Sequence, residues 1–143
     1  MQVESFPRCV NTKFQDIYIE LTKSGGVYYL SVKLNGKVSK NFVLDSGASD
    51  LLISKELGDY LKNSGLISDK DFIQHNNYID VSGRINRLEV YNLRTVQIGD
   101  VILKNVQCAI SNTQNIELLL GQSVLEKLGN YEIDYNSNQL IIK

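Results

Sequence analysis

The feature that most constrains the fold is a short apolar run that ends in a single carboxylate. Phe42-Val43-Leu44 leads directly into Asp45-Ser46-Gly47-Ala48-Ser49. Consecutive apolar residues are typical of a buried strand, and Ser-Gly after an Asp is typical of a tight turn. The glycine lets the backbone pass close to neighbouring groups. The sequence therefore predicts a buried strand that delivers Asp45 into a tight turn.

The residues before this run have the two-residue period of antiparallel strands. Apolar and polar side chains alternate over residues 16–22 and again over residues 27–34. Asn35-Gly36, a strong signal for a hairpin turn, connects the second of these segments to residues 37–44. The opening third of the chain is therefore predicted to be a hairpin whose second strand ends at Asp45.

The rest of the chain is predicted to consist mostly of strands, with short helices that start at Ser54 and after Gly121. The predicted strands are residues 51–53, 77–81, 84–98, 101–110, 131–134 and 139–142, with an apolar run at 117–121, and the predicted helical segments are residues 55–62, 68–74 and 122–128. This series predicts a small β-barrel or β-sandwich. We expect a single domain at residues 16–143, with residues 1–15 as an N-terminal arm.

Composition argues against several classes of function. The formal net charge is -1 and the Lys and Arg residues are scattered, so the chain has no basic patch for nucleic acid. No apolar stretch approaches the ~20 residues of a membrane span, and the N-terminus lacks the apolar core of a signal peptide, so we expect a soluble domain.

Metal and cofactor binding are not expected either. The chain has one histidine, His75, which is expected to lie in a solvated loop, and two distant cysteines, Cys9 and Cys108. This is too few ligands for a typical zinc site. The two cysteines are either small buried side chains or partners in a disulfide, and the sequence leaves both alternatives open.

The chain resembles the retropepsin-like aspartic peptidases, most closely their bacterial single-domain members. The resemblance rests on residues 42–49 and, later, on Leu118-Leu119-Leu120-Gly121 followed by a short helix. It covers about residues 17–143. It implies a mainly β fold, a small closed antiparallel β-barrel with one or two short helices. It also implies that Asp45 is the catalytic residue and that the second motif forms a strand beside the active-site loop.

Peptide hydrolysis of this kind needs two carboxylates. Two ionised Asp groups about 3 Å apart repel, so one keeps a proton and polarises the scissile carbonyl while the other takes a proton from water. No Asp other than Asp45 is followed by Ser or Thr and then Gly. The resemblance therefore implies an aspartic endopeptidase that acts on peptide or protein substrates as a symmetric homodimer, with Asp45 contributed twice.

The resemblance also implies roles for the residues around Asp45. Ser46 resembles the hydroxyl that crosses to the partner's active-site loop, and Gly47 permits close backbone approach. Residues 78–88 resemble the flap, a hairpin that closes over bound peptide, with Ser82-Gly83 at its tip. The predicted substrate-binding residues are Ala48, Ser49, Asp50, Tyr78, Ser82, Gly83 and Leu119.

Each of these assignments has a simpler alternative. Ser49 and Asp50 could serve local turn hydrogen bonds, and the flap could be an ordinary exposed hairpin. Three leucines could line substrate pockets but are expected to be core residues: Leu44, Leu51 and Leu119.

One position departs from the pattern of the viral relatives, which carry Arg after the second motif. This chain has Gln122 there, so a charge-assisted hydrogen bond near the expected dimer interface is lost. The alternative function is therefore a catalytically weak or inactive module that uses the same fold for peptide binding or dimerisation.

Overall fold

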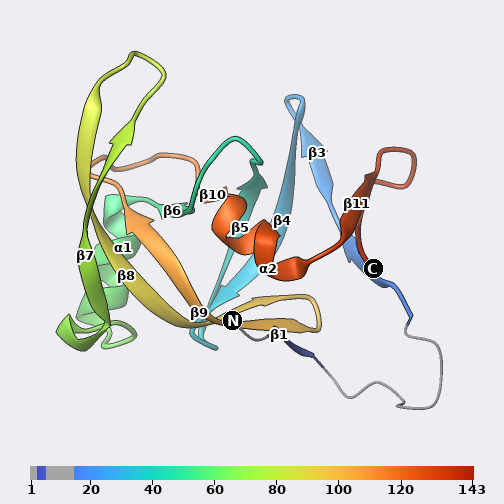
Figure 1. Ribbon diagram of the computed structural model, residues 1–143, viewed down its shortest axis with the longest axis horizontal. Coiled ribbons are helices and arrows are strands. Elements are labelled where there is room, and N and C mark those ends of the chain that lie inside the picture. Colours follow the sequence, from blue (N-terminus) through green and yellow to red (C-terminus); the bar gives the residue numbers. More distant parts are fainter. Residues whose placement is uncertain (1–2, 6–14) are drawn as a thin grey trace.

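The computed structural model describes residues 3–5 and 15–143, and these residues form a mainly β fold with two short α-helices (Figure 1). Six strands follow one another in a ring, in the order β9-β6-β10-β5-β4-β8, and β8 pairs with β9 again. The strands of the ring are β4 (Val27–Leu34), β5 (Val38–Leu44), β6 (Leu51–Ile53), β8 (Ile85–Ile98), β9 (Val101–Ile110) and β10 (Leu119–Leu120). The predicted mainly β, barrel-like fold is thus confirmed.

The ring is mixed and not purely antiparallel. β10 runs parallel to β5, and β6 runs parallel to β9. β10 lies between β5 and β6, so the strand that ends at Asp45 and the strand that follows its turn are both held by the second apolar motif. The antiparallel expectation is therefore wrong at these two pairs, because in each of them the two strands lie far apart in the chain and do not form a hairpin.

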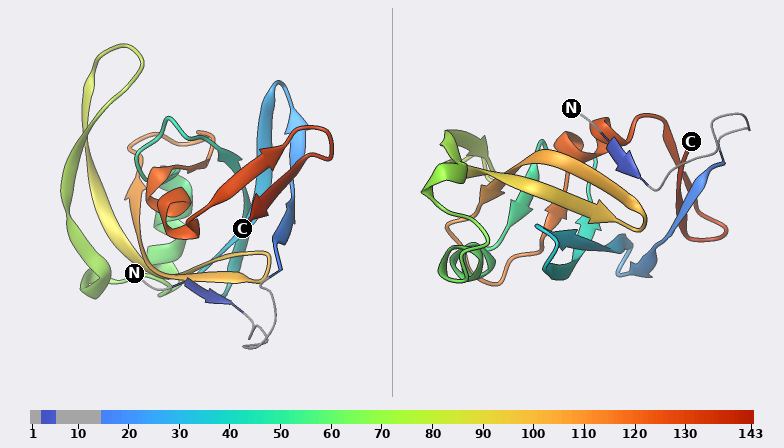
Figure 2. Two further views of the ribbon diagram at one scale, coloured as in Figure 1. Left: turned by 45° about the vertical axis from the view of Figure 1, so that its right-hand side comes forward. Right: turned by 90° about the horizontal axis from the view of Figure 1, so that it is seen from below.

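Three further strands extend the large sheet, and three others form a small sheet beside it. β1 (Val3–Ser5), β3 (Thr22–Ser24) and β7 (Phe72–Ile79) pair with β9, β4 and β8. The small sheet has the order β11-β12-β2, with β2 (Ile17–Glu20), β11 (Tyr131–Asp134) and β12 (Gln139–Ile142). Figure 2 shows this sheet on one side of the ring and the long β7–β8 hairpin standing clear on the other.

Local sequence explains the two helices. In α1 (Lys55–Asn63), the Ser54 hydroxyl accepts a hydrogen bond from the Leu57 N–H, as an N-cap residue does. α2 (Gln122–Leu128) ends at Gly129, whose φ of 73° is readily adopted only by glycine. Both helices bury their apolar faces in the core. The predicted helices at 55–62 and 122–128 are therefore confirmed.

The core fills the ring and the space beneath α1 and α2. Its fully buried large side chains come from strands, from both α-helices and, for Ile67, from the segment after α1: Phe42, Leu34, Leu51, Ile53, Leu61, Ile67, Leu93, Ile98, Leu103, Leu120, Leu125 and Leu140. Phe42 and Leu120 are both among them, so the two motifs that flank the Asp45 turn are anchored in the same core.

Two predicted segments differ from the structure. The strand expected over residues 16–22 is interrupted at Leu21, whose N–H bonds to the Asn138 carbonyl, so β2 joins the small sheet and β3 the large one. The helical turn expected at 68–74 is limited to a 3₁₀ turn at η1 (Asp69–Asp71), because β7 starts at Phe72 and pairs with β8. His75 therefore lies on a strand and not in a loop, although its side chain is exposed.

The N-terminal arm is described only in part. β1 pairs antiparallel with β9, with Val3 opposite Leu103. Cys9, and with it the predicted alternative of a Cys9–Cys108 disulfide, lies outside the described residues, whereas Cys108 is buried. Within the part of the chain that the structure describes, no helix combines the length and the apolar character that crossing a membrane requires.

Candidate active site

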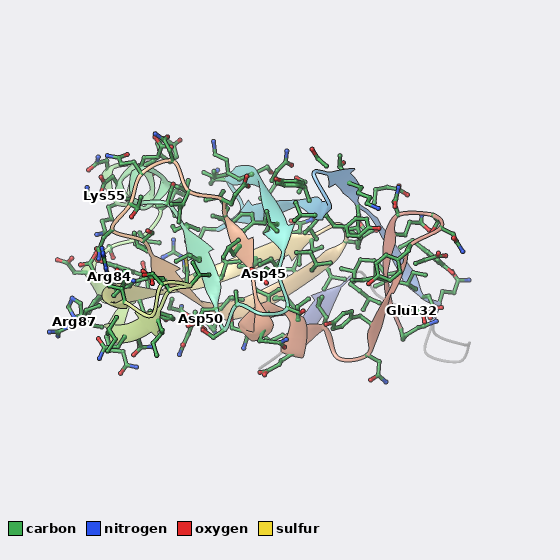
Figure 3. The ribbon with its side chains drawn as sticks, turned by 90° about the horizontal axis from the view of Figure 1, so that it is seen from above. Asp45, Asp50, Lys55, Arg84, Arg87 and Glu132 are labelled. Atoms are coloured by element: carbon green, nitrogen blue, oxygen red, sulfur yellow. The ribbon has the colours of Figure 1, made fainter. Side chains whose placement is uncertain are left out.

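Asp45 directly follows the last residue of β5 and lies near the middle of the view in Figure 3. Its N–H donates to the Leu120 carbonyl at 3.1 Å, and the Val43 N–H donates to the Leu118 carbonyl at 2.7 Å. The side chain is half-buried. The second apolar motif therefore fixes the backbone that presents this carboxylate.

The turn after Asp45 folds back on the carboxylate itself. The Gly47 N–H donates to Asp45 Oδ1 at 2.9 Å, and the Ala48 N–H donates to the Asp45 carbonyl at 3.2 Å. A Cβ on Gly47 would lie 3.3 Å from Asp45 Oδ1, which is a tight contact. Gly47 is not among the residues with positive φ. The glycine therefore provides space beside the carboxylate, not an unusual backbone conformation.

The start of α2 holds the other side of this loop. The N–H groups of Gln122 and Ser123 donate to the carbonyls of Ala48 and Ser49 at 2.8 and 2.9 Å. A Cβ on Gly121 would lie 2.5 Å from the carbonyl oxygens of Ala48 and Asp50. Because those atoms are backbone, they cannot rotate out of the way, so only glycine fits at position 121.

Gln122 also binds the loop through its side chain. Its Nε2 donates to the Ser46 carbonyl at 2.7 Å. Sequence reasoning considered only the charge that Gln122 lacks relative to Arg, and it missed this bond. The motif was a signal for it, because a residue directly after Gly121 was already expected to lie beside the active-site loop.

Tyr78 and Asp50, predicted separately as substrate-binding residues, are brought together by the fold. The Tyr78 hydroxyl of β7 donates to Asp50 Oδ2 at 2.6 Å, which ties the β7–β8 hairpin to the loop that carries Asp45. Burial and the hydrogen bond to Asp50 raise the pKa of Tyr78 to about 12. Cys108 is buried, and burial together with the nearby Asp50 charge raises the pKa of its thiol, so it is an inert core residue.

The tip of the β7–β8 hairpin is organised by Asp80. Its Oδ1 accepts hydrogen bonds from the Ser82 hydroxyl at 2.6 Å and from the N–H groups of Ser82 and Arg84, each at 3.0 Å. These bonds and one from Asn86 lower the pKa of Asp80 to about 2. Sequence reasoning placed Ser82 and Gly83 at the tip but missed Asp80, although an Asp two residues before a Ser is typical of such a turn.

The hairpin presents an apolar, exposed surface near its tip. The exposed fractions are 74% for Ile79, 110% for Val81 and 64% for Ile85. Ser82 and Gly83 are exposed as well, and the hydrogen bonds of their N–H groups go to Asp80 within the hairpin. The structure thus joins Tyr78 to the loop that carries Asp45 through a hydrogen bond and leaves the tip open to solvent.

The remaining predicted site residues differ in their exposure. Ser46 and Ser49 are exposed, and the Ser46 hydroxyl has no hydrogen-bond partner among the described residues. Leu119 is half-buried between β5 and β6. Leu51 is completely buried, so the core alternative is correct for that residue. No group of three potential metal ligands occurs in the described part of the chain.

Comparison with known proteins identifies the family. Residues 30–127 match the family described as "gag-polyprotein putative aspartyl protease". The solved structure of a retropepsin-like aspartic protease from Rickettsia conorii is similar in fold, with a TM-score of 0.63 and 24% identity over 99% of this chain and 91% of that one. No curated protein matches the sequence. Because the family match covers well over half of the chain, this protein belongs to the gag-polyprotein aspartyl protease family and has the retropepsin-like fold.

Proposed function

We propose that this protein is an aspartic endopeptidase that works as a symmetric homodimer. The observation that carries the proposal is the placement of Asp45 at the end of β5, with its turn held by Leu120, Gly121 and Gln122. A carboxylate held in this way has little freedom to move, which favours catalysis by a positioned acid or base.

The dimer follows from the chemistry, because one carboxylate cannot act as acid and base in the same step. The chain offers one Asp-Ser-Gly motif. Two copies related by a two-fold axis would place two Asp45 side chains together, where they share one proton. The ionised carboxylate would take a proton from water as the water attacks the carbonyl carbon, and the protonated one would donate to the carbonyl oxygen. The pair titrates as a unit.

The surrounding residues have positions suited to supporting roles. The unpartnered Ser46 hydroxyl is available to bond across the two-fold axis, and Gln122 holds the Ser46 carbonyl on the other side. The apolar residues near the hairpin tip would cover an extended peptide, while Tyr78 fixes the base of that hairpin to Asp50. Ala48, Ser49, Asp50 and Leu119 would line the cleft.

The first test is the Asp45→Asn variant, which keeps the size of the side chain but cannot act as a base. Cleavage of a mixed peptide library at mildly acidic pH should fall by at least about 10³-fold. Asp100→Asn, at an exposed turn far from the motif in sequence, is the matched control and should cleave like the wild type. Equal activity in wild type and Asp45→Asn would refute the assignment.

The second test addresses the dimer by mixing. If each active site needs two Asp45 residues, a tenfold excess of Asp45→Asn protein should trap wild-type chains in inactive pairs and lower activity roughly tenfold. A wild-type activity that is unaffected by the excess would show that one chain suffices. A strictly monomeric protein without turnover would instead favour the non-catalytic binding module.

A further inference from the structure

The edge of β5 that faces away from β4 is only partly paired. β4 pairs with β5 from Leu34 opposite Val38 to Tyr29 opposite Val43. On the other edge, β10 pairs only with Val43 and Leu44. No described strand pairs with residues 38–42 on this edge. The sheet therefore has an open edge five residues long, directly before the strand segment that leads to Asp45.

The direction of the backbone groups along this edge follows from the alternation of a β-strand. The N–H groups of Val43 and Asp45 point to β10, since they donate to Leu118 and Leu120. Every second residue of a strand points its N–H and carbonyl to the same side. Ser39 and Asn41 therefore direct their backbone donors and acceptors out of the sheet, toward the open edge.

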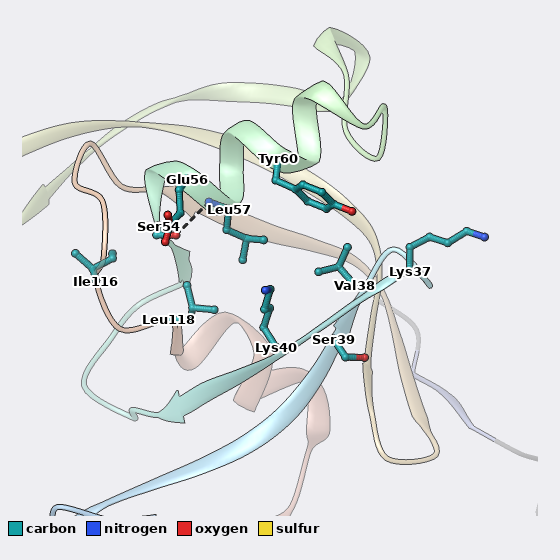
Figure 4. Close-up of a pocket in the computed structure, with 10 residues that line it drawn as sticks. All are labelled: Lys37, Val38, Ser39, Lys40, Ser54, Glu56, Leu57, Tyr60, Ile116 and Leu118. Atoms are coloured by element: carbon teal, nitrogen blue, oxygen red, sulfur yellow. Dashed lines mark hydrogen bonds between the residues drawn. The ribbon is translucent and has the colours of Figure 1, made fainter.

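A cavity of about 740 Å³ adjoins this edge, between β5 and α1 (Figure 4). Its apolar lining comes from β5, α1 and the segment before β10: Val38, Leu57, Ile116 and Leu118. It does not include Asp45. Lys40 lies five residues before Asp45 on the same strand, which corresponds to about 16 Å along the strand. The cavity is thus separate from the candidate active site.

The charge in this cavity comes mainly from Lys40. Its side chain extends from β5 into the space beneath α1, whereas Lys37 points away (Figure 4). Lys40 has no ion pair or hydrogen bond with any described residue. Glu56 is the one acidic residue of the lining, and it stands on the opposite wall near the start of α1. Lys40 is exposed, and a solvent-accessible amine without a partner on the wall of a cavity favours an anionic ligand.

We propose that this groove binds an extended peptide that carries an acidic side chain. The peptide would add to the sheet as a strand beside β5, in line with β10, through the outward backbone groups of Ser39 and Asn41. One Glu or Asp of the peptide would enter the cavity and pair with Lys40. Its neighbours two residues away would contact the apolar lining, because alternate side chains of a strand share a face.

The proposal is tested with a defined probe, the acetylated and amidated peptide Thr-Val-Thr-Glu-Thr-Val-Thr. Binding is followed by NMR titration of ¹⁵N-labelled protein in the Asp45→Asn background, so that the peptide is not cleaved. We expect the largest shift changes in residues 38–41 and in α1. Because no turnover is measured, failure of this proposal would leave the proposed peptidase function untouched.

Two substitutions test separately the ion pair with Lys40 and the backbone hydrogen bonds along the edge of β5. Lys40→Glu should weaken binding of the probe at least about tenfold and strengthen binding of the same peptide with Lys in place of Glu. Ser39→Pro removes a backbone N–H that points to the open edge and leaves the hydrogen bonds between β4 and β5 in place. It should weaken binding to a similar degree. Lys33→Glu, an exposed charge reversal on β4, is the matched control and should change affinity less than twofold.

Three outcomes would overturn the proposal. Shift changes confined to the Asp45 loop and the β7–β8 hairpin would place the peptide in the catalytic cleft. If the folded Lys40→Glu and Ser39→Pro variants bound the probe as tightly as the Asp45→Asn parent does, the groove would not be the binding site. A change of the oligomeric state of Ser39→Pro in the absence of peptide would show that a second copy of this chain occupies the edge.

Discussion

Replacing Tyr78 with Phe removes one hydroxyl group and leaves the ring in place. In the folded protein, that hydroxyl donates to Asp50 Oδ2 at 2.6 Å. The variant therefore breaks the hydrogen bond between the β7–β8 hairpin and the loop that carries Asp45. It also leaves the Asp50 carboxylate without this donor.

The expected magnitude follows from the geometry of the pair. A hydrogen bond to a charged group contributes about 1.5–3 kcal/mol when it is buried. Tyr78 and Asp50 are both half-buried, so water replaces part of the lost bond. We expect Tyr78→Phe to lower the free energy of unfolding by about 1 kcal/mol at neutral pH.

The pH dependence of this difference can be derived from the direction of the pKa shift. The pKa of Tyr78 rises from 10.0 to about 12 on folding. The folded state therefore holds the phenol proton more tightly than the unfolded state does between these values, and the stabilisation is lost as the pH rises through that window. The difference between wild type and Tyr78→Phe should be constant below pH 10 and shrink toward pH 12.

The assay is urea unfolding at one fixed protein concentration, combined with a double-mutant cycle. Tyr78→Phe, Asp50→Asn and the double variant give the coupling energy between the two side chains, for which we expect about 1 kcal/mol. Tyr18→Phe is the matched control, because Tyr18 is 57% exposed and its hydroxyl has no partner among the described residues. A coupling energy below about 0.3 kcal/mol would refute the hydrogen bond as a tie between the hairpin and the loop.

Three further predictions concern the same loop and hairpin. Gly121→Ala should lower the free energy of unfolding by more than about 2 kcal/mol, because its Cβ would lie 2.5 Å from two backbone carbonyl oxygens. A free energy of unfolding in urea within about 0.5 kcal/mol of the wild-type value would contradict this. Gln122→Ala should lower the free energy of unfolding by about 1 kcal/mol and should also lower kcat/KM, because the hydrogen bond to the Ser46 carbonyl is lost. Gln122→Glu, whose carboxylate cannot donate this bond, should show both losses as well. The pKa of folded Asp80 is lowered to about 2, so its contribution is present above pH 4 and is lost as the pH falls to about 2. The protection of the amides of residues 82–86 against exchange, relative to an unfolded peptide, should fall over that range, and Asp80→Ala should show the low protection already at pH 4 and above.

Local patterns were sufficient to predict most of the strands, because those strands alternate between two environments. β4 buries Leu30, Val32 and Leu34 and exposes Ser31 and Lys33, in agreement with the faces read from the sequence. The turn at 35–36 was equally accessible, since both residues adopt positive φ, at 47° and 68°. In such segments the side chain order alone decides which face is buried.

The prediction failed where pairing with a distant segment decided the structure. Residues 72–76 show no clear alternation of apolar and polar side chains. They form a strand because they pair with β8, with His75 opposite Glu89. Leu21 interrupts the first strand because its N–H bonds to the Asn138 carbonyl. Neither partner can be identified from the residues that surround the segment itself.

In the candidate site, too, some features follow from local sequence and others from contacts between distant segments. The sequence by itself determined that a buried strand ends at Asp45, that a tight turn follows, and that a second apolar motif stands beside it. Only the tertiary structure decided that Tyr78 bonds to Asp50 and that Gln122 bonds to Ser46, across 28 and 76 residues of chain. The physical reason is that strand periodicity sets which face a side chain occupies, whereas the register between distant strands sets which side chains meet.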